Sequence, residues 1–246
     1  MDILNDFTFA GPFGEIECLV EPNRSKSDAV LVMAHGFRGS RDSGGRAQGV
    51  AHQCAEHCDV VRFNFTGTRV LSQQVAELRS VIAEIRRRRP QAEIYLLGRS
   101  LGGAASIVTA GADEGISRLI LWATPNDLRF TFRYVMTDEL YGRLDAGETL
   151  EFDDERGHCV LTPDFLTDFD NYDLSRILAD WHGRRVLLLH CEGDQVVLAR
   201  QAVRNAELLG KWGELHLFAD GDHSFTEHSE EAGALIAGWI GRPCGK

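Results

Sequence analysis

Short apolar runs alternate with amphipathic segments along most of this 246-residue chain. Several runs, such as Ala29-Val30-Leu31-Val32-Met33, are continuously apolar, which is typical of strands that are buried on both faces. We predict strands at residues 15–20, 29–34, 60–65, 93–97, 119–123, 185–190 and 214–218, and helices at about 45–57, 74–89, 101–112, 199–209 and 227–240. This order predicts an α/β fold with a mostly parallel, doubly wound sheet of about seven or eight strands. The first strand or two are expected to form an antiparallel hairpin that turns near residues 11–14.

One segment interrupts this alternation. Residues 124–180 contain no run typical of a buried strand, and they carry aromatic and arginine side chains followed by an acidic patch at residues 151–155. We therefore predict a short helical cap, inserted into a single domain that spans residues 1–246. A chain of this length buries about 70–75% of its unfolded surface, which is enough for one large core.

The charge of the chain argues against several classes of function. The sequence has 26 Lys and Arg against 37 Asp and Glu, and its one basic run, Arg86-Arg87-Arg88-Arg89, ends a predicted helix, where cations suit the negative end of the helix dipole. We therefore expect no nucleic-acid partner. No apolar stretch has transmembrane length, and residues 1–6 lack the basic and apolar regions of a signal peptide. We expect a cytoplasmic protein without membrane insertion.

The cysteines show no disulfide-like spacing. They are Cys18, Cys54, Cys58, Cys159, Cys191 and Cys244, and they fit reduced thiols in a cytoplasmic protein. The metal-like cluster of the chain is His52, Cys54, His57 and Cys58, in which Cys54 and Cys58 share a helix face. Because no second ligand pair is evident, we interpret these two as buried thiols and predict neither a metal ion nor a cofactor.

A sharp turn is predicted at residues 98–103, Gly98-Arg99-Ser100-Leu101-Gly102-Gly103, between a strand and a helix. Glycines lie two residues before and two residues after Ser100. Side chains at both positions would collide in such a turn, and its strained backbone holds the serine hydroxyl outward. This pattern is typical of the nucleophile elbow of a serine hydrolase, although so short a pattern also occurs by chance.

Three further loops follow predicted strands and carry polar residues. In an open α/β sheet, the loops at the carboxyl ends of the strands form the binding site. These loops are His35-Gly36-Phe37-Arg38-Gly39-Ser40, Gly193-Asp194-Gln195-Val196-Val197 and Gly221-Asp222-His223. Asp220 and Asp222 are alternatives to Asp194, but both lie too near His223 in sequence to reach its far ring nitrogen easily. We therefore favour Ser100, Asp194 and His223, in this order along the chain.

These motifs resemble those of the α/β-hydrolase family, whose order is nucleophile, acid, histidine. The resemblance spans about residues 14–241 and weakens in the cap. The chain is most similar to bacterial serine esterases of the cinnamoyl/feruloyl-esterase and acylaminoacyl-peptidase-like types. Those enzymes combine an HGF-x-G loop, a G-x-S-x-G-G elbow, a G-x-D-x-x-V turn and a G-x-H turn. The resemblance implies an α/β-hydrolase fold.

Acyl-transfer chemistry gives each of these residues a role. His223 would take the proton of Ser100 as the serine attacks a carbonyl carbon, and Asp194 would orient the imidazole. The resemblance matches the backbone N–H groups of Phe37 and Leu101 to the oxyanion hole. Because a histidine base titrates near neutrality, activity should rise through about pH 6–7.

Other side chains near these motifs have two readings each. Arg99, and Arg38 together with Arg41, could contact a substrate carboxylate or pair with surface acids. The cap aromatics could form an apolar wall for one substrate arm or belong to the core of the cap; they are Phe130, Phe132, Tyr134 and Tyr141. We assign substrate contacts to Arg38, Arg99, Phe130 and Tyr134.

The chain also departs from the family pattern. The related esterases usually carry an R-G-x-G-x-S loop and several further residues before the next helix, whereas residues 64–70 here pass almost directly into a helix. The substrates of the family should therefore transfer poorly to this chain. His35 is expected to hold its loop, and His228 is expected to be a solvated helix residue.

We predict a serine carboxylesterase that hydrolyses small to medium soluble esters through an acyl-enzyme. A peptidase or a thioesterase would use the same three residues. A noncatalytic hydrolase fold that senses a ligand or binds a protein is an alternative of a different class. The expected partner is a small-molecule ester, and the sequence leaves a monomer and a dimer as alternatives.

Overall fold

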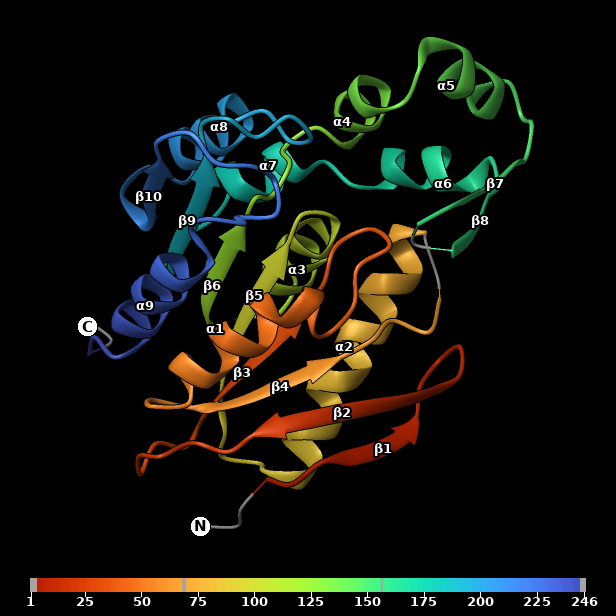
Figure 1. Ribbon diagram of the computed structural model, residues 1–246. Helices are drawn as coiled ribbons and strands as arrows, with labels where there is room; N and C mark the ends of the chain where they lie inside the picture. Colours follow the sequence, from red (N-terminus) through yellow and green to blue (C-terminus); the bar gives the residue numbers. More distant parts are fainter. Residues whose placement is uncertain (1–3, 68–69, 156, 244–246) are drawn as a thin grey trace.

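The computed structural model describes residues 4–67, 70–155 and 157–243 (Figure 1). Within them, eight strands form one sheet in the order β1-β2-β4-β3-β5-β6-β9-β10. The strands are β1 (Phe7–Ala10), β2 (Glu15–Glu21), β3 (Ala29–Ala34), β4 (Asp59–Phe63), β5 (Glu93–Arg99), β6 (Ile116–Trp122), β9 (Arg185–Cys191) and β10 (Gly213–Phe218). The β1–β2 and β2–β4 pairings are antiparallel and the pairings from β4 to β10 are parallel. The predicted sheet, with its antiparallel lead-in hairpin, is therefore confirmed.

Helices cover both faces of this sheet. They are α1 (Arg46–Cys54), preceded by the single turn η1 (Ser43–Gly45), α2 (Leu71–Arg88), α3 (Leu101–Gly111), α8 (Arg200–Leu209), followed by the turn η3 (Gly210–Trp212), and α9 (Ser229–Ile240). Helices α1 and α9 contact each other on one face, whereas α2 contacts α3 on the other (Figure 1). Helix α2 begins three residues earlier than the apolar spacing predicts, because Leu71 is already fully buried.

The alternation of side chains along the central strands divides the core into two layers. In β3, Leu31 and Met33 pack with α1 and α9, while Val30 and Val32 pack with α2 and α3. All six residues of β3 are buried. Burial of both faces explains the continuous apolar runs in the sequence. The strands end where this two-sided burial ends, and the polar loops follow there.

The segment between β6 and β9 is more than the helical cap that the sequence predicts. It contains α4 (Leu128–Val135), α5 (Asp138–Asp145), β7 (Leu150–Asp154), β8 (Gly157–Leu161), α6 (Asp164–Thr167), the turn η2 (Asp168–Asn171) and α7 (Leu174–Ala179). Strands β7 and β8 form a separate antiparallel hairpin. Its residues are mostly exposed, which is why no buried-strand run marks it. Helix α7 contacts α3 and α8, so it belongs to the helical layer of the main sheet rather than to the cap.

The basic run at the end of α2 is occupied by ion pairs. Arg87 and Arg88 each lie 2.8 Å from Glu84, and Arg86 lies 2.6 Å from Asp113. These pairs neutralise charge that the sequence presents as one cationic block. Across the described ranges, no helix is both long and apolar enough to cross a bilayer.

The metal-like cluster of the sequence does not converge on one point. Cys54 and Cys58 are fully buried, and burial raises the pKa of the Cys58 thiol to about 12. The His52 ring is instead exposed and lies 3.1 Å from Glu21. Cys244 lies outside the described residues. Among the residues that are described, no three potential ligand side chains are placed to hold a metal ion.

Candidate active site

Ser100 occupies the junction between β5 and α3, and its backbone is strained. Its φ of 53° and ψ of −123° are rarely adopted by a residue with a side chain. A Cβ atom on Gly98 would lie 2.6 Å from the Cα of Gly103, and one on Gly102 would collide with the carbonyl oxygens of Ala34 and His35. The two flanking glycines are therefore required by space, as the sequence predicts.

The loop after β3 approaches Ser100 closely. A Cβ atom on Gly36 would lie 2.9 Å from the Cβ of Ser100. His35 holds this loop, since its Nδ1 lies 2.9 Å from the Gly36 carbonyl and its Nε2 lies 3.1 Å from the Phe65 amide nitrogen. Burial lowers the pKa of His35, which favours the neutral ring that these two contacts require. These contacts agree with the expectation that His35 holds its loop.

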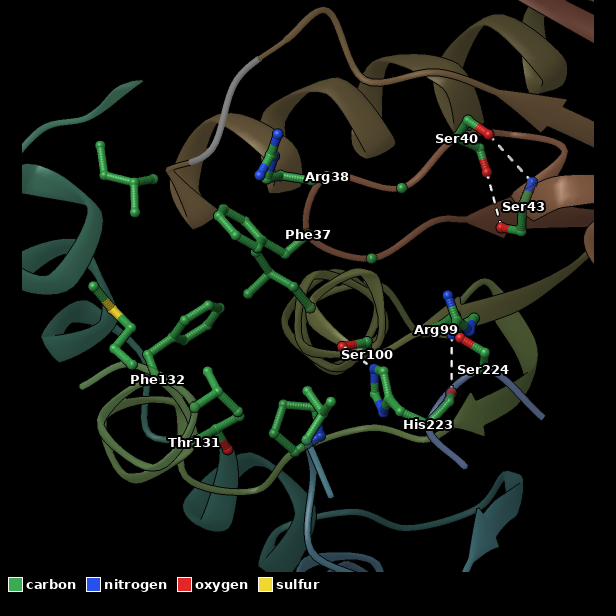
Figure 2. A pocket seen from close by; sticks show the side chains of 18 of the residues that line it. Phe37, Arg38, Ser40, Ser43, Arg99, Ser100, Thr131, Phe132, His223 and Ser224 are labelled. Carbon is green, nitrogen blue, oxygen red and sulfur yellow. Dashed lines mark hydrogen bonds between the residues drawn. The ribbon is translucent and has the colours of Figure 1, made fainter. Parts of the chain in front are cut away.

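Ser100, His223 and Asp194 form a continuous hydrogen-bonded chain. His223 Nε2 lies 3.1 Å from Ser100 Oγ (Figure 2). The Nδ1 atom of His223 lies 2.7 Å from Asp194 Oδ2. The three residues come from the ends of β5, β10 and β9, which are far apart in sequence. With Nδ1–H donated to the carboxylate, Nε2 is left as an acceptor for the serine proton.

The Asp194 carboxylate is buried and saturated with donors. Its Oδ1 accepts hydrogen bonds of 2.8 and 2.9 Å from the amides of Val196 and Val197. Burial alone would raise the pKa of Asp194, but hydrogen bonds from His190 and His223 lower it overall. Asp194 therefore remains ionised. Asp222 instead accepts hydrogen bonds from the amide and hydroxyl of Thr226. Of the three candidates Asp194, Asp220 and Asp222, the described contact with the His223 ring is made by Asp194.

Sequence reasoning missed His190, the penultimate residue of β9. This ring is fully buried, and its Nε2 lies 2.7 Å from the Val197 carbonyl and 3.3 Å from Asp194 Oδ2. It therefore reaches both ends of the turn that carries the acid. The available signal was a polar ring inside an apolar strand, four residues before Asp194.

The environment of His223 favours its neutral form. Burial lowers the pKa of His223 and the Asp194 carboxylate opposes this, while the nearby Arg99 charge lowers the pKa further. The net direction is downward from the ordinary value of 6.5. The activity limb that the sequence places at about pH 6–7 is therefore expected at lower pH.

Two backbone amides beside Ser100 are available as donors. Phe37 directly follows Gly36, and Leu101 is the first residue of α3. Neither amide has a hydrogen-bond partner within the described parts of the chain. An N–H in the first turn of a helix finds no carbonyl inside that helix. Both amides are thus free to bind an oxygen atom of a ligand near Ser100.

Ser100 and His223 face a cavity of about 570 Å³ between the sheet edge and the cap. It is lined by Gly36, Phe37, Arg38, Gly39, Ser40, Ser43, Gly44, Arg46, Arg99, Ser100, Leu101, Pro125, Thr131, Phe132, Val135, Met136, Thr137, Leu140, Leu150, Phe152, Leu161, Val196, His223 and Ser224. Figure 2 shows Phe37 and Phe132 on one side of Ser100, and Ser43 on the other.

The cap aromatics occupy different faces of α4. Phe130 stacks on Tyr134 with ring centroids 6.0 Å apart, and neither is among the described residues that line the cavity. Thr131, Phe132 and Val135 line it instead. The structure therefore does not bring Phe130 and Tyr134 to the predicted substrate contacts. The two-residue spacing of these aromatics places them on opposite sides of a helix.

The arginines that the sequence singles out all have protein partners. Arg38 lines the cavity but forms a bidentate ion pair with Asp154 of β7. Arg41 lies 2.6 Å from Glu17. Arg99 donates from Nη2 to the carbonyl oxygen of His223 at 2.9 Å. Sequence reasoning missed Arg46, which also lines the cavity and had no motif to mark it.

The connection between β4 and α2 is held by a contact with α2 itself. Thr66 binds Glu77 of α2 through its amide and its hydroxyl. Helix α2 then starts at Leu71, so the connection is short, as the sequence predicts. Thr68 and Arg69 lie outside the described residues. His228 is partly exposed, 3.5 Å from Glu231, just before α9 rather than within it.

Several known structures share this architecture. An esterase domain from Rhodothermus marinus is 19% identical, with a TM-score of 0.76 over 97% of this chain and 98% of its own. Est1E from Butyrivibrio proteoclasticus is 15% identical, with a TM-score of 0.81 over 96% of this chain and 98% of its own. An α/β serine hydrolase without a lid from Xanthomonas campestris is 18% identical, with a TM-score of 0.67 over 99% and 97% of the two chains. No curated protein matches the sequence significantly.

Comparison of the sequence with family models agrees with the topology of the sheet. The model of the Alpha/beta hydrolase family matches residues 31–235, which is most of the chain. The match begins in β3 and ends in α9, so it includes every loop that contributes to the hydrogen-bonded chain. The protein belongs to the α/β-hydrolase family.

Proposed function

We propose that this protein is a serine hydrolase that cleaves carboxylic esters of small to medium soluble substrates. One observation carries the proposal: Ser100 Oγ, on a strained turn, lies 3.1 Å from His223 Nε2, whose Nδ1 is bound to the buried Asp194. Ser100 and His223 line a cavity large enough for a small ester. The strained backbone at Ser100 destabilises the fold, so stability alone does not explain it. Strain of this kind is concentrated at functional sites, which supports a catalytic role for Ser100.

In the proposed mechanism, Ser100 Oγ attacks the ester carbonyl carbon while its proton moves to His223 Nε2. The carbonyl double bond opens and its electron pair remains on oxygen. The amides of Phe37 and Leu101 are proposed to bind this oxyanion, and each such donor typically contributes about 2.7–4 kcal/mol to transition-state stabilisation. Asp194 stays ionised and stabilises the imidazolium.

The tetrahedral intermediate then collapses. His223 returns the proton to the alcohol oxygen as the ester C–O bond breaks, which leaves an acyl group on Ser100. Water repeats the sequence, with His223 again acting as the base, and releases the carboxylic acid. Both halves require the neutral imidazole, which the lowered pKa of His223 favours.

Esters are favoured as substrates by the names of the structural neighbours. Several are called esterases, and one structure of Est1E contains ferulic acid. Phenolic esters therefore belong in the set of substrates to be tested. A peptidase or a thioesterase would use the same residues, so aminoacyl anilides and acyl-CoA thioesters belong there too.

The test is turnover of p-nitrophenyl esters of increasing chain length by the wild-type chain and by Ser100→Ala. The variant should lose roughly 10⁴- to 10⁶-fold in kcat while it keeps its fold. A fluorophosphonate should label the wild-type chain at Ser100. If the wild type neither cleaves any ester nor reacts with the probe, or if Ser100→Ala keeps its activity, the proposal is wrong.

A further inference from the structure

The cavity around Ser100 has two chemically different walls. Cap residues line one wall with apolar groups, which include Phe132, Val135, Met136 and Leu140. The other wall carries hydroxyl and guanidinium groups from the loop before α1, from the start of α1, from β5 and from the loop after β10; these residues are Ser40, Ser43, Arg46, Arg99 and Ser224. We call this second set the polar wall. Figure 2 shows Ser40, Ser43, Arg99 and Ser224 on this side of Ser100. A substrate bound at Ser100 would place one arm against each wall.

The charge of the cavity is opposite to that of the protein. The chain has a formal net charge of −11. Yet the described residues that line the cavity include three arginines and neither Asp nor Glu. A cleft lined by one sign of charge concentrates ligands of the other sign, because its low-dielectric walls focus the field. The cavity is therefore suited to an anion.

The three arginines differ in what neutralises them. The charge of Arg38 is matched by the Asp154 carboxylate, and Arg99 donates a hydrogen bond to the carbonyl oxygen of His223. No hydrogen bond or ion pair joins the side chain of Arg46 to another described residue. Arg46 acts on Asp222 only through its charge, as one of several influences on that carboxyl group. Arg46 is thus the guanidinium that is best placed to bind an anionic group of a ligand.

The backbone fixes Arg46 in this wall. The three residues that precede Arg46 are Ser43, Gly44 and Gly45, and their φ values are 47°, 64° and 90°. Arg46 is the first residue of α1. The first turn of α1 contains no acidic residue, so the positive end of its dipole adds to the guanidinium charge. In the same wall, the hydroxyl groups of Ser40 and Ser224 have no acceptor among the described residues.

We propose that the ester cleaved at Ser100 carries a carboxylate on one arm, and that Arg46 with the hydroxyls of the polar wall binds it while the other arm lies against the apolar cap wall. This inference rests on the proposed hydrolase function. A single guanidinium with hydroxyl donors matches a monoanion in charge and in hydrogen-bonding capacity. The carboxylate belongs either to the acyl arm or to the alcohol arm, and the two cases require separate substrates.

The test compares matched pairs of esters. For the acyl arm, the mono-p-nitrophenyl ester of adipic acid is compared with p-nitrophenyl hexanoate. For the alcohol arm, p-acetoxybenzoate is compared with p-acetoxybenzamide. In at least one pair, the wild-type kcat/KM for the anionic ester should exceed that for the neutral ester, and the preference should decrease with added salt.

Variants of Arg46 show whether this residue causes the preference. Arg46→Gln should lower the ratio of anionic to neutral kcat/KM by roughly 10- to 100-fold, because it removes a charge-assisted hydrogen bond. Arg46→Lys keeps the charge and should retain part of the ratio. The matched control is Arg79→Gln, which removes the same charge from an exposed position on α2, away from the cavity. This control should leave the ratio unchanged.

Failure of this inference is distinguishable from failure of the proposed function. Equal or lower kcat/KM for both anionic esters, with neutral esters still cleaved in a Ser100-dependent way, would overturn the carboxylate site and leave the hydrolase intact. A preference that survives Arg46→Gln unchanged would also overturn it. No cleavage of any ester would overturn the hydrolase function, and the site with it.

Discussion

Arg99 and His223 are joined by a hydrogen bond of 2.9 Å, from the arginine Nη2 to the histidine carbonyl oxygen. Arg99 is the last residue of β5 and immediately precedes Ser100. One strand end therefore carries the proposed nucleophile and also the group that holds the loop of the proposed base. Burial is the main cause of the lowered pKa of His223, and the Arg99 charge lowers it further.

The first prediction concerns the pH dependence of activity. Protonated His223 cannot accept the Ser100 proton, so activity is lost as the pH falls through the pKa of His223. For a neutral ester, we expect the acidic limb of kcat/KM below the ordinary histidine value of 6.5. Arg99→Met removes a charge that disfavours the imidazolium and should move this limb to higher pH. A limb that stays in place in the variant would contradict the assigned influence of Arg99.

The second prediction concerns His190, which we expect to position Asp194. His190→Leu removes the donor that lies 3.3 Å from Asp194 Oδ2 and 2.7 Å from the Val197 carbonyl. We expect kcat to fall about tenfold with little change in KM. A less firmly held Asp194 orients His223 less well, and this weakens stabilisation of the transition state more than it weakens substrate binding. His190→Gln can still donate a hydrogen bond and should keep more of the activity. Equal losses in both variants would indicate a packing role only.

The third prediction concerns the link between the cap and the Phe37 loop. Arg38 follows Phe37 directly and donates to Asp154 and to the Gly157 carbonyl, which lies 2.7 Å away. Arg38→Met should detach the β7–β8 hairpin from this loop and lower kcat/KM about tenfold, because small displacements of positioning groups are costly. Arg143→Met breaks an exposed ion pair within the cap and serves as the control. It should leave kcat/KM within about twofold.

The fourth prediction separates two cap aromatics. Phe132 is 7% exposed and packs on Phe37, Phe165 and Phe169. Phe132→Ala should lower the free energy of unfolding by about 3 kcal/mol or more. Phe130→Ala should cost about 1 kcal/mol, because its ring is only half-buried and contacts Tyr134 and the Arg200 guanidinium. Chemical denaturation measures both values, and similar costs would contradict the placement of the two rings.

The fifth prediction uses the strain at Ser100. Glycine adopts a φ of 53° readily, whereas alanine does not. Ser100→Gly should therefore be more stable than Ser100→Ala by about 1 kcal/mol or more, although both lack the nucleophile. Denaturation of the two variants provides the measurement. Equal stabilities would show that the turn relaxes when the serine is replaced.

The positions of Ser100, Asp194 and His223 could be predicted because each belongs to a short local motif directly after a strand. Each motif contains glycines where the backbone must turn tightly, and the parallel sheet brings the ends of its strands together. The sheet was predictable for a related reason, since strands buried on both faces leave long apolar runs. The family match confirms that fold.

The remaining features depend on contacts between distant segments. Nothing near Arg46 in the sequence shows that its guanidinium lacks a partner among the described residues, because this depends on where each carboxylate lies in the fold. Phe130 and Phe132 look equivalent in sequence, and only the docking of α4 decides which ring turns inward. The β7–β8 hairpin was missed because exposed strands need no apolar run.

The left-handed backbone at Ser100 sets the stability of the fold against the proposed turnover at a single position. A library of variants sorted only for soluble yield or melting temperature would enrich glycine there, and every such chain would lack the proposed nucleophile. Selection for a more stable protein therefore requires a screen in which the proposed ester cleavage is scored together with stability.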